Sequence, residues 1–251
     1  MDLELQDRVY LVTGGGRGLG RATAEVLVAE GARVVLSGRD GDILDTAAAE
    51  LGDSARPVVA DNADPETPAR LMSAAQDAWG RVDGALVSVG GPPVGPVTDV
   101  TDQQWTDSFA SVFLGAVRLC REVGPQLPHG GSLALVLSTS VHSPLPNMAV
   151  SNGFRPGLAM VAKQLSDELG PQGVRVNGLL PGRVGTDRVA ELDALTGDAE
   201  AARQRMVAQI PLGRYGEPEE FGRVAAFLLS PAASFLTGIM LPVDGGMTRT
   251  F

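Results

Sequence analysis

Short apolar runs alternate along the chain with longer segments of helical periodicity. The runs are rich in Val and Leu, and they lie at residues 8–13, 33–38, 57–61, 84–90, 132–138, 174–182 and 239–246. Strands that are apolar throughout are typical of a parallel sheet that helices cover on both faces. The alternation therefore predicts an α/β fold, a Rossmann-like doubly wound parallel sheet of about seven strands.

This pattern continues through the whole chain without a linker. The 32 glycines and 17 prolines are scattered, and there is no change of composition and no repeat of fixed period. A length of 251 residues also suits one large domain. We therefore expect a single domain over 1–251, with ligands bound beyond the carboxyl ends of the strands.

Composition and charge argue against several kinds of partner. The net charge of −10 disfavours a nucleic-acid-binding surface, and no apolar run reaches the ~18 residues of a membrane helix. The acidic start, MDLELQDR, lacks the layout of a signal peptide. Because Cys120 is the only cysteine and His129 and His142 the only histidines, we expect no disulfide framework and no metal site. A cytoplasmic protein acting on a small molecule fits these numbers best.

A glycine-rich loop follows the first predicted strand. Gly14, Gly18 and Gly20 have the spacing G-x-x-x-G-x-G and open a helical segment. A backbone without Cβ atoms can turn tightly and approach a pyrophosphate, and the start of a helix favours negative charge. The simpler interpretation is a plain turn, but the strand before it and the helix after it favour a dinucleotide-binding loop.

The end of the second predicted strand bears on which dinucleotide is bound. An acid at this point would accept hydrogen bonds from the adenosine ribose, but the chain has Gly38 followed by Arg39, and Arg17 lies in the glycine loop. Two guanidinium groups suit a 2′-phosphate. Asp40 lies one residue farther on, where it can cap the next helix. The pattern favours NADP(H) over NAD(H), unless both arginines are simply solvated surface charges.

Taken together, the motifs resemble the short-chain dehydrogenases/reductases of the 3-oxoacyl-[acyl-carrier-protein] reductase type. The resemblance spans nearly the whole chain and rests on TGGGRGLG (13–20), SGRD (37–40), Asp61, VRVNGLLPGRVGT (174–186), PLGRYGEPEEFG (211–222) and FLTGIMLPVDGG (235–246). It implies a nicotinamide cofactor. The residues then expected to bind the cofactor are Gly14, Arg17, Gly18, Leu19, Gly20, Arg39, Asp61, Asn62, Gly90, Arg155, Pro181, Gly182 and Thr186. It also implies a homodimer through the fourth and fifth helices, or a homotetramer that adds the LPVDGG region.

The chain departs from the family at the catalytic positions. The family uses Asn, Ser, Tyr and Lys, and counting from the motifs places Val112, Ser138, Ser151 and Arg155 there. Only the serine is kept. A subgroup of reductase-like relatives carries the same S-N-x-x-R pattern in place of Y-x-x-x-K.

The residues that remain limit the chemistry. Arg155 follows Ser151 by one helical turn, so its guanidinium could hold ribose hydroxyls and supply positive charge, but it stays protonated and cannot serve as the acid. Ser138 and Ser151 could stabilise an oxyanion together while water delivers the proton. That arrangement would lose part of the ~10²–10⁴-fold that a positioned general acid contributes.

His142 is a second possible source of the proton, since imidazole titrates near neutrality. The simpler interpretation, which we favour, is a histidine at the rim without a catalytic role. Ser140 and Asn147 are weaker candidates, because polar loop residues usually serve turns.

Two further features shape this end of the chain. Pro156 would cost about 3 kcal/mol inside a helix, which predicts either a helix that starts late, with Asn152 as its N-cap, or a local kink. Residues 187–209 are polar and charged, and their position suits a lid over the substrate or a pair of solvated helices.

Three functions stay open on the sequence alone. The first is an NADP(H)-dependent oxidoreductase that reduces a carbonyl or oxidises an alcohol, with Ser138, Ser151 and Arg155 in the site. The second is a dehydratase, isomerase or cyclase on the same scaffold. The third is a catalytically impaired nucleotide-binding homologue. The intact glycine loop favours the first two, and the missing Tyr and Lys favour the last two.

Overall fold

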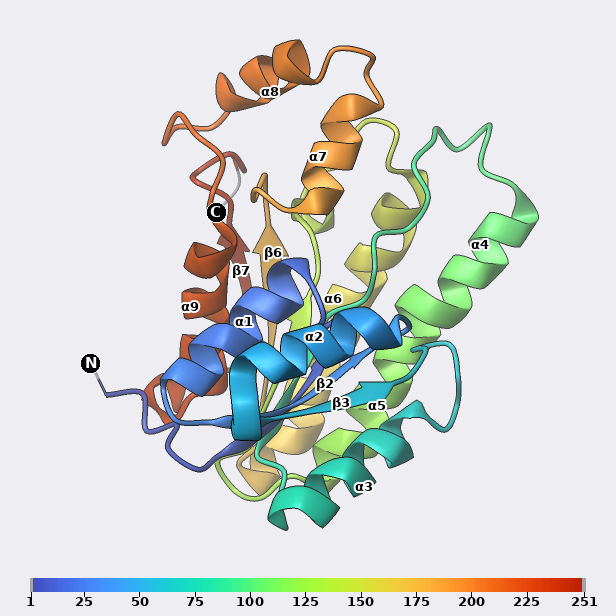
Figure 1. Ribbon diagram of the computed structural model, residues 1–251. Helices are drawn as coiled ribbons and strands as arrows, with labels where there is room; N and C mark the ends of the chain where they lie inside the picture. Colours follow the sequence, from blue (N-terminus) through green and yellow to red (C-terminus); the bar gives the residue numbers. More distant parts are fainter. Residues whose placement is uncertain (1, 250–251) are drawn as a thin grey trace.

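The computed structural model describes residues 2–249, and its centre is one parallel sheet of seven strands (Figure 1). The strands are β1 (Val9–Thr13), β2 (Arg33–Gly38), β3 (Ala55–Val59), β4 (Gly84–Val87), β5 (Ser132–Val136), β6 (Arg175–Pro181) and β7 (Met240–Val243). Their order across the sheet is β3-β2-β1-β4-β5-β6-β7. The predicted fold class and strand number are confirmed.

Helices cover both faces of this sheet. They are α1 (Gly18–Ala29), α2 (Gly41–Leu51), α3 (Thr67–Trp79), α4 (Asp102–Ser108), α5 (Gly115–Val123), α6 (Ala149–Leu169), α7 (Asp187–Ala194), α8 (Ala199–Val207) and α9 (Pro218–Leu229). One core cluster joins the sheet to α1, α2 and α9, and the other joins it to α3, α5 and α6. None of the helices in residues 2–249 is long and apolar enough to cross a membrane.

The third strand is the one whose predicted position is wrong. It runs from Ala55 to Val59 rather than over 57–61, and it pairs with β2 at the edge of the sheet. Arg56 and Pro57 are exposed. A proline is tolerated on an edge strand because one side needs no hydrogen bond, and an exposed edge lacks the continuous apolar pattern that locates the inner strands.

The strand order reverses between β1 and β4. Thr13 ends β1, and its Oγ1 donates a hydrogen bond of 2.7 Å to the carbonyl of Ser88, whose own N–H donates back at 2.9 Å. These two bonds fix the loops that follow β1 and β4 to one another. Open α/β sheets bind ligands in the crevice at such a reversal.

A buried arginine stabilises the opposite end of the sheet. Arg175, at the start of β6, is 6% exposed and donates hydrogen bonds to the carbonyls of Leu228, Leu229 and Ser230. These carbonyls belong to the last turn of α9 and the residue after it, where a helix leaves its carbonyls without partners. Arg175 is therefore a structural cation whose donors are taken by the backbone.

The predicted late start of α6 is wrong. The helix begins at Ala149, so Pro156 lies inside it. Asn152 is not an N-cap: its side-chain amide exchanges hydrogen bonds of 3.0 and 2.8 Å with the backbone N–H and carbonyl of Leu145. This pair closes the preceding loop onto the first turn of α6, and the helix starts four residues earlier than the proline alone suggested.

Candidate active site

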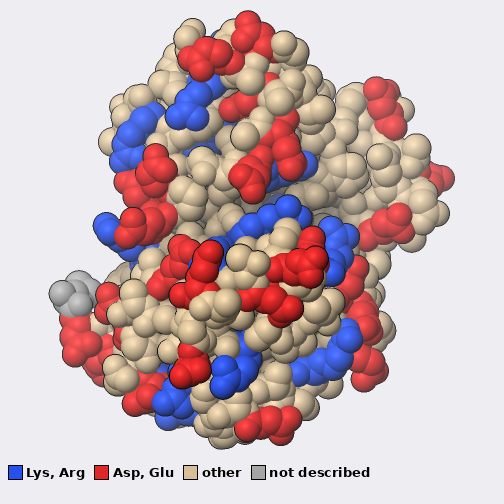
Figure 2. Space-filling view, in the orientation of Figure 1, with Lys and Arg blue, Asp and Glu red and all other residues tan. Residues whose placement is uncertain are grey.

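A cavity of about 870 Å³ opens at the carboxyl edge of the sheet, around the point where the strand order reverses. Its lining comes from the glycine loop, the ends of β2, β3 and β4, and the segment around α4. The space-filling view shows a hollow across this face with basic side chains at its edge, although acidic side chains cover much of the surface around it (Figure 2).

The structure brings part of the predicted cofactor set to this cavity. Gly14, Arg17, Arg39, Asp61, Asn62 and Gly90 line it. In the described part of the chain, the other predicted residues lie outside its lining: Gly18, Leu19, Gly20, Pro181, Gly182, Thr186, Ser138, Ser151 and Arg155. The cavity thus covers the half of the crevice that lies over β3, β2, β1 and β4.

The glycine loop has a shape that strongly favours glycine. Gly14 and Gly18 have φ of +61° and +57°, in the left-handed region. A Cβ on Gly14 would lie 3.0 Å from the carbonyl oxygen of Ser88, and a Cβ on Gly20 would meet the carbonyl of Gly14. The loop therefore leaves its backbone open to the cavity and leads into the amino end of α1, which suits a phosphate group.

The end of β2 carries positive charge. Arg17 and Arg39 are both exposed at the cavity, while Gly38 offers no side chain. Asp40 accepts a hydrogen bond of 3.2 Å from the N–H of Ile43 and so caps α2, as the sequence allowed. The nearest acid after β2 is therefore engaged with its own helix.

Asp61 shapes the next loop. Its carboxylate accepts a hydrogen bond of 2.9 Å from the N–H of Ala63, and its carbonyl accepts one of 2.6 Å from the Thr67 hydroxyl. The half-buried Asp61 and Asn62 remain at the wall of the cavity.

Beyond β6, the P-G-x-x-x-T segment lies beside the glycine loop. A Cβ on Gly18 would lie 3.7 Å from Cγ2 of Thr186. The N–H of Gly182 donates to the carbonyl of Val243, which ties this segment to β7. Pro181, Gly182 and Thr186 thus border the half of the crevice opposite Arg39.

One wall of the cavity has a helical shape that sequence reasoning missed. A π-helical segment, Phe109–Leu114, joins α4 to α5, and such segments occur often at functional sites. It carries Val112, which is 4% exposed and lines the cavity together with Ser108 and Ser111. The apolar periodicity of this segment gives no sign of the π-helical turn, because the local widening leaves no mark in it.

Three serines meet where β5 is followed by α6. Ser138 is half-buried, and its Oγ accepts a hydrogen bond of 3.1 Å from the N–H of Ser140. The hydroxyls of Ser140 and Ser151 lie 3.2 Å apart and are buried. The direct partner of Ser151 is therefore Ser140, a residue that the sequence interpretation ranked below Ser138. His142 is exposed, in the loop that follows.

Arg155 lies one turn beyond Ser151 and is 5% exposed. Its Nη1 donates a hydrogen bond of 2.6 Å to the carbonyl of Val136, the last residue of β5, while its buried Nε has no partner in residues 2–249. Burial lowers the pKa of Arg155 to about 10. The guanidinium remains charged at neutral pH, and it holds donors that the protein leaves free.

Neither tyrosine of the chain belongs to this region. Tyr10 lies near the amino end of β1 and donates to the carbonyl of Leu229, and Tyr215 donates to Asp193. The single lysine, Lys163, is exposed two turns beyond Arg155 on α6. Among residues 2–249, the groups at hand are thus hydroxyls and a guanidinium, with no phenol or amine beside them.

The helices α7 and α8 project beyond the carboxyl ends of the strands (Figure 1). Arg188, in the first turn of α7, donates a hydrogen bond of 2.7 Å to the carbonyl of Pro92 at the cavity wall. A Cβ on Gly91 would lie 2.5 Å from Nε of Arg188. One side chain therefore joins α7 to the loop after β4.

A buried carboxylate holds the other end of α7. Asp193 is 6% exposed and accepts hydrogen bonds of 3.0 Å from the Tyr215 hydroxyl and 3.2 Å from Nη1 of Arg183. The guanidinium of Arg203, from α8, lies 4.5 Å from the centre of the Tyr215 ring. The segment between β6 and α9 is thus packed around its own polar core.

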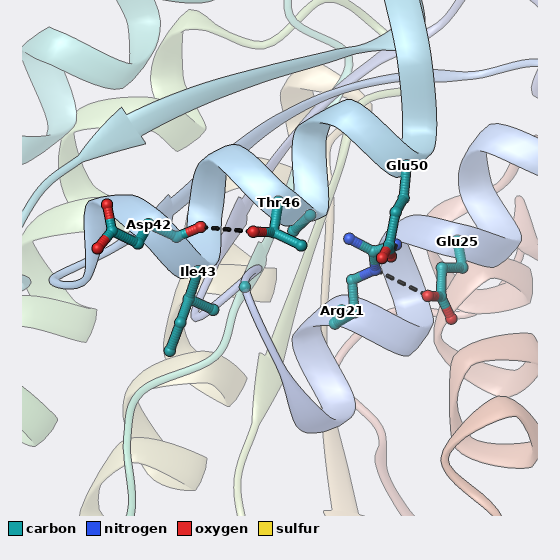
Figure 3. Close-up of a pocket in the computed structure, with 8 residues that line it drawn as sticks. Arg21, Glu25, Asp42, Ile43, Thr46 and Glu50 are labelled. Atoms are coloured by element: carbon teal, nitrogen blue, oxygen red, sulfur yellow. Dashed lines mark hydrogen bonds and ion pairs between the residues drawn. The ribbon is translucent and has the colours of Figure 1, made fainter.

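A second hollow, of about 350 Å³, lies between α1 and α2 (Figure 3). Arg21 is its only cation, and it pairs with Glu25 at 2.7 Å and with Glu50 at 2.8 Å. Because both carboxylates occupy the guanidinium, this groove offers little to a ligand. Residues 2–249 contain no group of three or more His, Cys, Asp or Glu side chains that could hold a metal ion.

The fold and the glycine loop define a doubly wound α/β protein with a nucleotide-type crevice at the strand reversal. A family model described as enoyl-(acyl carrier protein) reductase matches residues 14–248. The chain belongs to the short-chain dehydrogenase/reductase family of oxidoreductases.

Individual relatives match over nearly their whole length. An L-rhamnose 1-dehydrogenase (NAD(P)(+)) of Azotobacter vinelandii is 33% identical over 253 residues, which cover 97% of this chain and 97% of that protein. An L-sorbose reductase from Gluconobacter frateurii, solved with NADPH and L-sorbose, has a TM-score of 0.94 at 28% identity and covers 100% of both chains. A 3-ketoacyl-(acyl-carrier-protein) reductase from Brucella melitensis, complexed with NADH, has a TM-score of 0.86 at 30% identity and covers 97% of this chain and 99% of that one.

Proposed function

We propose that the protein is an NADP(H)-dependent oxidoreductase that reduces a carbonyl, or oxidises the corresponding alcohol, on a small molecule. The observation that carries this proposal is the glycine loop beside a cavity of about 870 Å³. The wall of this cavity presents Arg17 and Arg39 at the place where an acid would select NAD(H). Relatives solved with NADPH and with NADH support a nicotinamide cofactor of either kind, so the preference for the 2′-phosphate rests on the two arginines.

Such a cofactor, when bound, supplies or accepts the hydride. The chain's own residues then orient the ligands and handle the charge. The dinucleotide would be held by the predicted cofactor set, from Arg39 at the adenosine end to Thr186 and Arg155 at the nicotinamide end. Ser138 and Ser151 would donate hydrogen bonds to the substrate oxygen, and Arg155 would hold ribose hydroxyls with the donors that Val136 leaves free.

The site lacks an obvious proton donor for this reaction. Ser140 is in contact with Ser151, so these two hydroxyls form a short chain along which a proton could pass from water. Lacking a tyrosine acid, the site would be slower than a complete one by part of the ~10²–10⁴-fold typical of general acids. The same lack favours a second candidate function, that of a catalytically impaired nucleotide-binding homologue.

We also propose that residues 187–209 form a lid over the substrate. The Arg188–Pro92 hydrogen bond supports this, because it joins α7 to the cavity wall.

Exposed apolar side chains of the π-helical segment and of α6 support the expected homodimer. Phe109 stacks on Phe113 and is 44% exposed, and Met160 is 71% exposed.

Cofactor titration of the full-length protein tests the proposal. We expect NADPH to bind at least tenfold more tightly than NADH, and R39Q to remove most of that difference. R223Q, on the exposed face of α9, is the matched control for loss of one positive charge. Nicotinamide absorbance followed with a panel of ketoses, small ketones and 3-oxoacyl thioesters then separates turnover from binding alone. A protein with no affinity for either dinucleotide would contradict the proposal.

A further inference from the structure

Arg155 differs from Arg175, the other buried arginine, in how many of its N–H donors have hydrogen-bond partners. Arg175 gives its donors to three backbone carbonyls at the end of α9. Arg155 gives one hydrogen bond to Val136, its Nε has no partner, and it takes part in no ion pair among residues 2–249. Arg175 has no ion pair in this range either, but its donors are satisfied by the backbone. A buried charge whose donors lack partners is costly, so Arg155 calls for a function outside the packing of the core.

The fold places this charge at one end of the crevice. The hydrogen bond to Val136 puts the guanidinium at the carboxyl end of β5. A dinucleotide in a doubly wound sheet lies across the strand reversal, with one nucleoside on each side. Since Arg39 and Asp61 mark the adenosine side over β2 and β3, the other nucleoside lies on the side of β5 and β6, next to Arg155.

No acidic side chain in the segment around Arg155 balances its positive charge. Residues 132–160, which form β5, the following loop and the first half of α6, contain no Asp, Glu or Tyr. The three hydroxyls that meet between β5 and α6, those of Ser138, Ser140 and Ser151, are neutral. From this segment, a ligand therefore meets one buried positive charge and no negative one.

We propose that Arg155 makes this end of the crevice selective for the charge of the nicotinamide ring, so that the protein binds the reduced dinucleotide more tightly than the oxidised one. The inference rests on the proposed function. The reduced ring is uncharged and the oxidised ring carries a positive charge, so only the oxidised ring is repelled by the guanidinium. At an effective dielectric constant of about 20, repulsion between two unit charges costs roughly a hundredfold in affinity at ~6 Å and roughly tenfold at ~12 Å.

This selectivity has a consequence for the reaction. The oxidised dinucleotide would dissociate readily after each turnover, because the charge that repels it is fixed. A lysine paired with a tyrosinate would have carried a compensating negative charge. With Ser151 and Arg155 in their place, the site favours carbonyl reduction over alcohol oxidation at equal concentrations of the two cofactor forms.

Equilibrium binding tests the inference without any turnover. Dissociation constants for NADPH and NADP⁺ are measured by titration on the full-length wild type, R155Q, R155K and the control R223Q, an exposed arginine of α9. We expect the wild type to favour NADPH by at least tenfold. R155Q should reduce that ratio by about tenfold, chiefly through tighter binding of NADP⁺, while R155K and R223Q keep it.

Three results would overturn the inference. One is a wild type that binds NADP⁺ as tightly as NADPH. Another is an R155Q protein that weakens both forms equally, which would mean that Arg155 only holds the ribose. The third is a wild type with no affinity for either form, which would overturn the proposed function as well. If R155Q does not fold, R155M, which is apolar and suits the buried position, gives the same comparison. If the protein takes NADH instead, the ratio of NADH to NAD⁺ is the quantity measured.

Discussion

The hydroxyl oxygens of Ser140 and Ser151 lie 3.2 Å apart, in a buried contact between the loop after β5 and the first turn of α6. Each hydroxyl has one proton to donate and can accept two hydrogen bonds. If Ser140 donates to Ser151, the proton of Ser151 is free for a ligand. With the bond in that direction, the contact orients Ser151 for donation, which is the role that the sequence assigned to it.

Replacing Ser151 tests that role. We expect S151A to lower kcat by about 10²–10³-fold, the range found when one donor to an oxyanion is removed, with a small change in KM. S140A should lower kcat less, since Ser151 then keeps its proton but loses its orientation. Steady-state kinetics with the best substrate of the carbonyl panel measures both. S143A, in the exposed part of the same loop, is the control. Undiminished turnover by S151A would show that this hydroxyl has no part in the chemistry.

A second prediction concerns the loop after β4. A Cβ at Gly91 would lie 2.5 Å from Nε of Arg188, so G91A should displace this side chain and break its hydrogen bond to Pro92. If α7 closes the crevice through that bond, both G91A and R188A should release bound dinucleotide several-fold faster. Stopped-flow displacement measures the rate. The control is G80A, because nothing lies within 4 Å of a Cβ at Gly80, although its φ of +71° adds local strain. Unchanged release rates in both variants would mean that α7 is not a lid.

The sheet was predictable because each inner strand is apolar throughout. The burial of β1, β4 and β5 is complete along their length, and that burial is what the sequence pattern records. The edge strand β3, with Arg56 and Pro57 exposed, carried a weaker signal and was displaced by two residues. The start of α6 was mistaken because a long-range contact, the Asn152 amide on Leu145, outweighs the preference of Pro156.

The candidate site was predictable where its shape is local. Gly14 and Gly18 need positive φ, and that need is visible in one short motif. Ser140 and Ser151 are 11 residues apart in the chain, and Arg188 and Pro92 are 96 residues apart. No periodicity or turn rule encodes such pairs, since they depend on how the finished sheet brings its loops together.

A third prediction concerns the proline inside α6. Pro156 has no N–H, so the carbonyl of Asn152, four residues earlier, lacks its usual donor. P156A restores this hydrogen bond. The substitution also makes the unfolded chain more flexible, which offsets part of the gain in stability. We expect a net gain of about 1–2 kcal/mol in the free energy of unfolding, measured by urea denaturation. P65A is the control, because Pro65 is exposed and lies in a turn before α3. A loss of stability in P156A would mean that the helix is shaped around the proline ring.

A fourth prediction uses the two tyrosines as reporters of the packed core. Burial raises the pKa of Tyr10 well above its usual range, and burial together with Asp193 raises the pKa of Tyr215 to about 12. A raised pKa in the folded state stabilises the fold fully below the unfolded value of about 10, and this stabilisation is lost as pH rises through the folded value. The native protein should therefore form almost no tyrosinate between about pH 10 and 11, whereas protein unfolded in urea should titrate near pH 10. Tyrosinate absorbance in the ultraviolet measures this directly. In Y215F only Tyr10 remains, so the first tyrosinate signal should move to still higher pH. A native protein in which one tyrosine ionises near pH 10 would mean that the contact between Asp193 and Tyr215, and with it the packing of α7, is not formed in solution.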